Sequence, residues 1–267
     1  MSTPRLLVLG GGRIGGALLG GLLRSGWAEV SECVVAEKRP EARELLLERF
    51  GELRVVEAPI DADAAVLAVK PSDLRVACAD LRGARFNRVL SVVAGATLTQ
   101  LESQLWPGAP VVRAMPNTPA LLGMSASAIA AGRHASESDL EWAEGVLSSI
   151  GVVARLPEPL IDAATGLSGS GPAYVFLIAE ALIDAGVLAG LEREVARLLS
   201  VQTILGAAHM LAESGESAEA LRAAVTSPGG TTAAGIRALE RAGLRAAFLE
   251  AVMAARDRSA ELGRDSV

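Results

Sequence analysis

Three glycines near the amino terminus have the spacing of a dinucleotide-binding loop. The segment Gly10-Gly-Gly-Arg-Ile-Gly15 fits G-x-G-x-x-G, with an apolar strand pattern at 5–9 before it and a helical pattern at 14–23 after it. Such glycines let the chain turn tightly, let the backbone approach a pyrophosphate and let the helix pack on the strand. The residues expected to contact the phosphates of a nicotinamide dinucleotide are Gly10, Gly12, Arg13, Ile14 and Gly15.

The charges after the second expected strand bear on which dinucleotide is bound. The strand at 33–36 ends in Glu37-Lys38-Arg39, where the adenosine ribose should lie. An acidic residue there accepts hydrogen bonds from the ribose hydroxyls of NAD, whereas adjacent cations hold the 2′-phosphate of NADP. Lys38 and Arg39 favour NADP, provided that Glu37 points elsewhere, and NAD is possible. Alternatively, all three are solvated charges that open a helix at 40–50.

Two further strands are expected to end at the same edge of the sheet. The strand at 64–69 runs into Lys70-Pro71, where proline stops the strand and directs the chain over the carboxyl edge. Open α/β folds bind ligands at that edge, so Lys70 is either a cofactor contact or an exposed lysine at a strand end. The strand at 88–94 ends in small residues that leave room for a nicotinamide ring.

A stiff loop follows the next strand. The strand at 110–115 leads into Met115-Pro-Asn-Thr-Pro119, in which two prolines flank two polar residues. We expect this loop to form part of the wall of the nicotinamide pocket, although a rigid turn has the same pattern. An α/β Rossmann domain with a mostly parallel, doubly wound sheet is therefore predicted over residues 1–157, completed by a strand at 125–131, a helix at 137–150 and a strand at 151–156.

From Leu160 onward the pattern is helical, which predicts an all-α domain over residues 158–267. The helices at 192–214 and 244–263 are apolar around most of their circumference, so we expect them to be buried on most sides. A domain of this size cannot cover them alone, and a homodimer formed through this half is expected. The other expected helices are at 172–187, 218–224 and 231–242.

Two loops in the helical half could bind an anion. The first, Leu167-Ser-Gly-Ser-Gly-Pro-Ala173, is expected to expose its backbone at a helix N-terminus, or to be a domain junction whose glycines allow tight packing. The second, Val225-Thr-Ser-Pro-Gly-Gly-Thr-Thr232, precedes a helix that begins with threonines. Its N–H and hydroxyl donors suit a small carboxylate, and the alternative is an ordinary helix N-cap.

Composition excludes several classes of function. A formal charge of −6 provides no basic stripe for nucleic acid. The uncharged runs at 114–132 and 163–179 contain Pro and Gly and are typical of a folded core, so no membrane span is expected. The first strand begins near Arg5, which leaves no room for a signal peptide. Cys33 and Cys78 have neither metal nor redox spacing, which favours free thiols in the cytoplasm and no metal site.

The acid–base residues narrow the chemistry further. Reduction of a ketone usually needs a proton donor such as His or Lys. The two histidines, His134 and His209, are expected to be structural, and the helical half contains no lysine. This disfavours the β-hydroxyacid dehydrogenases, whose similar architecture places a lysine in the helical domain. A protonated imine accepts hydride and becomes an amine without a strong acid.

Over almost its whole length the chain resembles the pyrroline-5-carboxylate reductase family. The resemblance implies a Rossmann domain followed by a helical dimerisation domain, with dimers often assembled into decamers. It also implies hydride transfer from NAD(P)H to the C=N carbon of 1-pyrroline-5-carboxylate, which gives L-proline. The motifs that carry it are Leu9-Gly-Gly-Gly12, Ala68-Val-Lys-Pro71, Met115-Pro-Asn-Thr-Pro119, Thr165-Gly-Leu-Ser-Gly-Ser-Gly-Pro-Ala-Tyr174 and Ser227-Pro-Gly-Gly-Thr-Thr232.

The resemblance also implies roles for individual residues. Thr231 and Thr232 would hold the substrate carboxylate, with Ser227 and Gly230 of the same loop, and the Thr232 hydroxyl would lie close to the ring nitrogen as the catalytic contact. Glu158 matches a further substrate-contact position. The remaining positions that would contact the cofactor are Val69, Lys70, Pro71, Val92, Val93 and Ala94.

The chain departs from the family pattern at two places. Arg13 replaces a polar Asn or Gln, and can reach a phosphate or point outward. Glu37-Lys38-Arg39 replaces Asn-Arg or serines, which bears on the choice of nucleotide. Two alternative functions remain: a reductase of six-membered cyclic imines, and a non-catalytic protein that senses NADP.

Overall fold

The computed structural model describes residues 3–265, which form two compact units. The first unit contains the chain through Ser170 together with the C-terminal segment from Met253. The second unit is Gly171–Val252. The second unit is thus inserted, in sequence, between two parts of the first.

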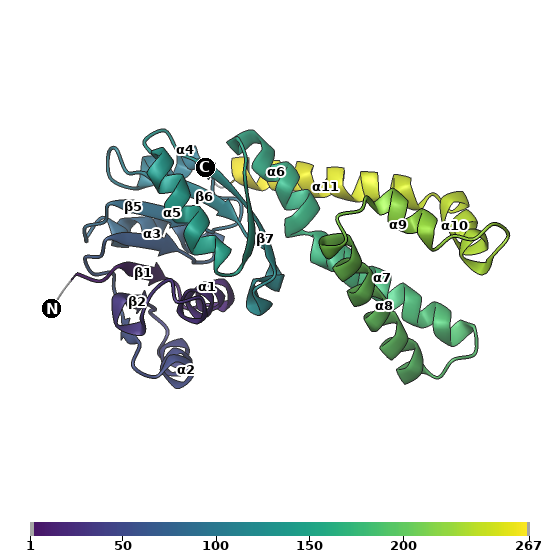
Figure 1. Cartoon of the computed structure of the whole chain (residues 1–267). Helices are drawn as coiled ribbons and strands as arrows, with labels where there is room; N and C mark the ends of the chain where they lie inside the picture. The colour runs from purple at the N-terminus through teal and green to yellow at the C-terminus, as the bar shows by residue number, and fades with distance from the viewer. Residues whose placement is uncertain (1–2, 266–267) are drawn as a thin grey trace. The chain divides into compact units, whose positions relative to one another are not determined.

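The first unit is built on an eight-stranded sheet in the order β3-β2-β1-β4-β5-β6-β7-β8 (Figure 1). All neighbouring strands are parallel except β6 and β7, which are antiparallel. The expected parallel-dominated Rossmann sheet is therefore confirmed. The strands are β1 Leu6–Leu9, β2 Cys33–Ala36, β3 Arg54–Val56, β4 Ala64–Leu67, β5 Arg88–Ser91, β6 Val111–Met115, β7 Ser125–Ala131 and β8 Gly151–Arg155.

Both faces of the sheet carry helices, which explains why its central strands are continuously apolar. Because side chains alternate along a strand, Leu6 and Val8 of β1 pack into one apolar core, while Leu7 and Leu9 pack into the other. Helices α1, α2 and α5 contribute to the first core, and α3 and α4 to the second. The bounds are α1 Arg13–Arg24, α2 Pro40–Phe50, α3 Leu74–Leu81, α4 Leu98–Gln104 and α5 Glu137–Ser148.

The segment at 167–173 is largely helical, so the prediction of an exposed loop is wrong. The alternative prediction, a domain junction, agrees with the division of the two units after Ser170. Helix α6, Ile161–Ala164, continues into a π-helix, Thr165–Gly169. The N–H of Ser170 donates to the carbonyl of Thr165 at 2.8 Å, which closes the wide turn. The hydroxyl of Ser168 donates back to the carbonyl of Ala164 at 3.0 Å. The backbone that was expected to be exposed is therefore largely used within the helix.

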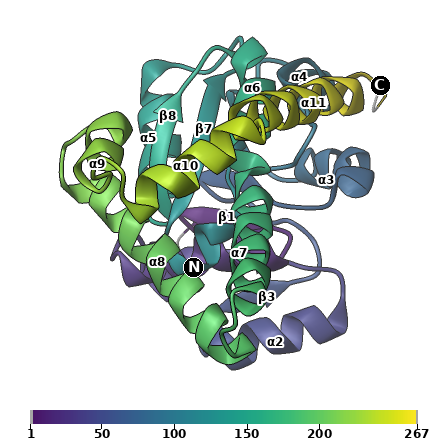
Figure 2. The ribbon, with the colours of Figure 1, turned by 90° about the vertical axis from the view of Figure 1, so that its right-hand side faces the viewer.

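The second unit is helical, as predicted. Helices α7 and α8 lie side by side and are joined by a short turn (Figure 2). Helix α11 begins in this unit, and its C-terminal part, from Met253, belongs to the first unit. The bounds are α7 Gly171–Leu188, α8 Arg193–Glu213, α9 Ala218–Ala224, α10 Thr231–Arg241 and α11 Leu244–Asp265.

The apolar side chains of α7 and α8 are largely exposed in the single chain. Phe176 and Leu198 each expose more than 60% of their surface, so the expected burial on most sides is not found within one chain. The stretches Glu158–Leu188 and Arg193–Glu213 are also long and apolar enough to cross a membrane, by length and composition only. Length and composition alone do not contradict the expectation of no membrane span, because the exposed helices of a protein that assembles with other chains pass the same test.

Candidate nucleotide and carboxylate sites

The glycine loop between β1 and α1 cannot hold larger side chains at two positions. Gly10 has φ +105°, and a Cβ on it would lie 2.6 Å from the carbonyl oxygen of Ala68. A Cβ on Gly15 would lie 2.0 Å from the carbonyl oxygen of Gly10. Glycine at these positions therefore permits the tight turn and the close packing of helix on strand that a dinucleotide site requires.

The N-terminus of α1 is open to an anion. Gly12 is its N-cap, no side chain caps it, and a Cβ on Gly12 would meet no atom within 4 Å. The first helical bond runs from the N–H of Gly16 to the carbonyl of Gly12, which leaves the preceding N–H groups without helical partners. These donors and the helix dipole fit a pyrophosphate, with Arg13 exposed beside them.

Glu37 points towards this loop. Its Oε2 accepts a hydrogen bond from the N–H of Gly11 at 3.0 Å, and its Oε1 accepts one from the N–H of Arg39 at 3.0 Å. The Arg39 guanidinium adds bonds of 3.0 and 3.3 Å. Burial raises the pKa of Glu37, but the hydrogen bonds from Arg39 and Gly11 outweigh it, and the pKa is lowered overall. The carboxylate is thus buried and ionised.

The neighbouring cations already have carboxylate partners. Arg39 pairs with Glu37, and the Nζ of Lys38 lies 2.7 Å from Asp80 of α3. The prediction of NADP from Lys38 and Arg39 required Glu37 to point elsewhere. The structure does not meet that condition.

The strand ends that follow β4 and β5 lie along the same carboxyl edge. Lys70 is exposed and precedes a short 3₁₀ helix, Pro71–Asp73. The side chains of Val92 and Val93 are buried in the two apolar cores, so Ala94 is the exposed member of this group. Contacts from Val92 and Val93 to a cofactor would therefore come from the backbone, whereas Val69 is half-buried.

Asn117 fastens the loop after β6 to two other segments. Its Nδ2 donates to the carbonyl of Ser168 in the π-helix at 2.9 Å, and its Oδ1 accepts from the N–H of Ala126 at 3.0 Å. The hydroxyl of Ser125 accepts from its backbone N–H at 3.2 Å. The sequence marked this loop as stiff from its prolines, but the amide that holds it in place was not singled out.

The carboxylate of Glu158 is engaged within the first unit. Its Oε1 accepts bonds from the N–H of Leu98 at 2.6 Å and from the buried guanidinium of Arg113 at 3.0 Å. Arg113 also lies 3.9 Å from Asp162, which accepts a bond from Ser259 of α11 at 2.7 Å. Glu158 therefore has a structural partner at the position where the sequence predicts a substrate contact.

The loop before α10 has the geometry of a small anion site. Gly230 is the N-cap, and its N–H donates to the carbonyl of Ser227 at 3.1 Å. A Cβ on Gly230 would lie 2.3 Å from the Ser227 hydroxyl oxygen, so a larger residue there would require the Ser227 side chain to move. No side chain caps the helix, unlike the ordinary N-cap that was the alternative. Within residues 3–265, the hydroxyls of Thr231 and Thr232 have no hydrogen-bond partner.

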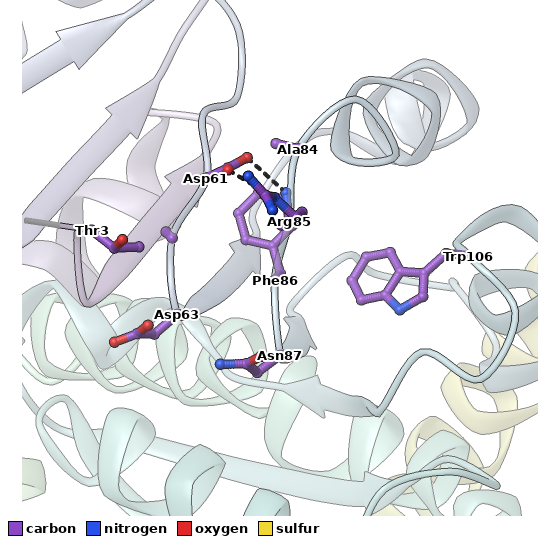
Figure 3. A pocket seen from close by; sticks show the side chains of 9 residues that line it. Thr3, Asp61, Asp63, Ala84, Arg85, Phe86, Asn87 and Trp106 are labelled. Atoms are coloured by element: carbon purple, nitrogen blue, oxygen red, sulfur yellow. Dashed lines mark hydrogen bonds and ion pairs between the residues drawn. The ribbon is translucent and has the colours of Figure 1, made fainter.

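A separate pocket lies at the opposite, amino edge of the sheet (Figure 3). Its volume is about 570 Å³, and its walls come from segments that precede β1, β4, β5 and β6. Arg85 pairs with Asp61 in its wall at 3.1 Å. The pocket is lined by none of the predicted site residues. No group of three or more His, Cys, Asp or Glu residues in the described part of the chain could hold a metal ion.

These features are those of a dinucleotide-dependent oxidoreductase: a Rossmann sheet with an open glycine loop, followed by a helical unit in which no side chain caps the start of α10. The model of pyrroline-5-carboxylate reductase dimerisation domains matches residues 158–262, and a model described as NADP oxidoreductase, coenzyme F420-dependent, matches residues 5–95. A pyrroline-5-carboxylate reductase from Mycobacterium tuberculosis is 45% identical, covering 97% of this chain and 96% of the relative. The chain therefore belongs to the pyrroline-5-carboxylate reductase family.

Solved structures agree with this assignment. The pyrroline-5-carboxylate reductase of Coxiella burnetii superposes with a TM-score of 0.91 at 35% identity, covering 98% of this chain and 99% of that one. The Plasmodium falciparum pyrroline carboxylate reductase, solved with NADP bound, has a TM-score of 0.80 at 29% identity, with 98% and 99% coverage. The family resemblance and the fold predicted from the sequence are both confirmed.

Proposed function

We propose that the protein reduces 1-pyrroline-5-carboxylate to L-proline with NAD(P)H. The observation that carries the proposal is the N-terminus of α10, which no side chain caps. There the backbone N–H groups of Thr231 and Thr232 lie beside two hydroxyls that have no hydrogen-bond partner among residues 3–265. Such a site suits the carboxylate of a small imino acid. The family membership supports the same substrate class.

The reaction needs no acidic side chain of the protein to donate a proton, because the imine is already protonated. When bound, a reduced nicotinamide would supply a hydride, which would become bonded to the carbon of the C=N bond of the protonated imine. The π electrons of C=N become the nitrogen lone pair, and the amine carries the proton already present. The residues of this chain bind and orient: Thr231 and Thr232, with Ser227, hold the carboxylate, and the Thr232 hydroxyl lies near the ring nitrogen.

The nucleotide would bind at the carboxyl edge of the sheet in the first unit. The N–H groups at the start of α1, from Arg13 to Gly15, would hold the pyrophosphate beside the space at Gly12. Lys70, Pro71 and the backbone after β5 would border the nicotinamide. Both NADH and NADPH are proposed as hydride donors.

We propose that the chain works as a homodimer through its helical half, and that dimers assemble further, with a decamer as the expected size. The exposed apolar side chains of α7 and α8 support this, because a contiguous apolar surface is costly to leave in water. The dimerisation model that matches residues 158–262 spans these helices, which supports a second copy of the chain as the partner of this surface. The cytoplasm is the proposed location, consistent with two buried free cysteines.

The test is the oxidation of NADH and NADPH by purified protein in the presence of 1-pyrroline-5-carboxylate, followed by product analysis for proline. Oxidation that depends on the substrate supports the proposal. Comparison of kcat/KM for the five- and six-membered cyclic imino acids decides between the two imine reductases, because one methylene changes binding by only about 1–3 kcal/mol. Nucleotide binding without oxidation of either substrate would instead favour a sensor.

A further inference from the structure

We propose that Glu37 selects the nucleotide and makes this chain prefer NADH to NADPH. The inference rests on the proposed function for one point only, that the adenosine ribose lies at the end of β2. It concerns the segment Glu37-Lys38-Arg39, which directly follows β2. The steps below use the contacts of these three side chains.

The Glu37 carboxylate is fixed by the backbone. One oxygen accepts from the N–H of Gly11 in the phosphate loop and the other from the N–H of Arg39, each at 3.0 Å. Only 7% of Glu37 is exposed. Turning the carboxylate away would leave these N–H groups unpaired, so the charge stays beside the loop when a nucleotide binds.

Arg39 occupies the place of the ribose hydroxyls. A carboxylate has about four acceptor positions, and the backbone takes two of those on Glu37. The guanidinium of Arg39 donates to the other two acceptor positions, and the Arg39 side chain is exposed. The two ribose hydroxyls of NADH can replace these two guanidinium bonds one for one, while the backbone bonds remain.

A 2′-phosphate has no such exchange available. Its oxygens accept hydrogen bonds and cannot donate one to the Glu37 carboxylate. Because the phosphate and the carboxylate are both negatively charged, they also repel each other. The charges of Arg39 and Lys38 are partly offset by Glu37 and Asp80, so each cation attracts a phosphate less strongly than an unpaired one would. Both cations lie at the right place for NADPH, and both are already paired.

The experiment measures dissociation constants of NADH and NADPH by the fluorescence of the reduced nicotinamide, with no imine present. The parent should bind NADH more tightly. Glu37→Gln keeps an acceptor, adds an N–H donor and removes the charge. It should lower the ratio of the NADPH to the NADH dissociation constant by about tenfold to a hundredfold, the value of hydrogen bonds to a charged group.

Two further variants sharpen the result. Glu48→Gln removes the same charge from an exposed residue near the C-terminal end of α2, and should leave the ratio unchanged. Arg39→Ala removes the guanidinium that the ribose displaces, and should tighten NADH binding. A loss of NADPH affinity in Arg39→Ala, with NADH affinity intact, would show that Arg39 holds a 2′-phosphate and would overturn the proposal.

The remaining outcomes are also decisive. A parent that prefers NADPH, or a ratio that Glu37→Gln does not change, overturns the role of Glu37, even if overall affinity falls. Failure to bind either nucleotide overturns the nucleotide site, and with it the proposed function. If the ratio shifts as expected but 1-pyrroline-5-carboxylate is not reduced, the inference stands and the proposed substrate fails.

Discussion

The guanidinium of Arg113 on β6 lies 3.0 Å from Oε1 of Glu158, which opens the segment leading to the π-helix. The same oxygen accepts from the N–H of Leu98, so one carboxylate joins β6, α4 and the start of the helical sequence. Arg113 exposes only 6% of its side chain, and an unpaired charge there would be costly. Glu158 therefore has a structural task whether or not it contacts substrate.

Glu158→Gln should lower the free energy of unfolding by about 1–3 kcal/mol, because a buried guanidinium loses its charged acceptor. Urea denaturation of the parent and the variant measures this. Glu144→Gln is the control, since its partner Arg155 is at the surface and exposed ion pairs contribute about 0–1 kcal/mol. An unchanged stability with a raised KM for the imine would show that Glu158 serves the substrate.

Thr232→Ala should lower kcat/KM for 1-pyrroline-5-carboxylate by about tenfold to a hundredfold, through loss of a hydroxyl bonded to a charged group. Nucleotide affinity should not change, because Thr232 lies in the other unit from the phosphate loop. Thr226→Ala is the matched control, since its hydroxyl already donates to the carbonyl of Arg222 at 2.6 Å. Equal activity of parent and Thr232→Ala would rule out the proposed carboxylate contact.

Alanine substitutions in the phosphate loop should separate binding from folding. A Cβ at position 12 meets no protein atom, so Gly12→Ala should weaken nucleotide binding and keep the parent Tm. A Cβ at position 15 lies 2.0 Å from the Gly10 oxygen, so Gly15→Ala should also destabilise the fold, by about 1–3 kcal/mol. Nucleotide titration and thermal unfolding give the two readouts. Unaltered binding in Gly12→Ala would place the pyrophosphate elsewhere.

Both cysteines should resist thiol reagents in the native protein. Burial raises the pKa of Cys33 and of Cys78 to about 11. At pH 8 about one thiol in a thousand would then be ionised, and the thiolate is the reactive form. Titration with a chromogenic disulfide should show no rapid reaction until denaturant is added. Fast reaction of one thiol under native conditions would mean that its surroundings open readily.

The lowered pKa of Glu37 makes part of the stability dependent on pH. Because the folded pKa lies below the ordinary value of 4.5, the contribution of Glu37 is present above pH 4.5 and is lost as pH falls through the folded pKa. The difference in unfolding free energy between the parent and Glu37→Gln should therefore be largest above pH 4.5 and shrink on acidification. A difference that stays constant in acid would assign the effect to packing.

Much of the first unit was predictable because its signals are local. Buried parallel strands such as Leu6–Leu9 are apolar runs, and the glycine spacing marks the turn that follows. The sequence missed β3, which is three residues long at the sheet edge, as well as the short helices α3 and α4. Elements of this length contain too few repeats of the alternation between apolar and polar residues to be recognised from the sequence.

Other features depend on tertiary contacts and could not be read from local pattern. The glycines and serines at 165–171 suggest a loop, yet side-chain bonds to preceding carbonyls and the amide of Asn117 hold the segment as a helix. The direction of Glu37 depends on the N–H of Gly11, which is distant in sequence. The start of α10 was better predicted, because its glycines and threonines are contiguous.

The insertion of the second unit between two parts of the first has a consequence for biosynthesis. The first unit includes the segment of α11 from Met253, where Gln100 donates to the carbonyl of Gly263 at 2.9 Å and Ser259 donates to Asp162. These partners for Gln100 and Asp162 lie after the whole second unit in the sequence. The nucleotide-binding half therefore completes its packing only after the inserted helical unit has been synthesised.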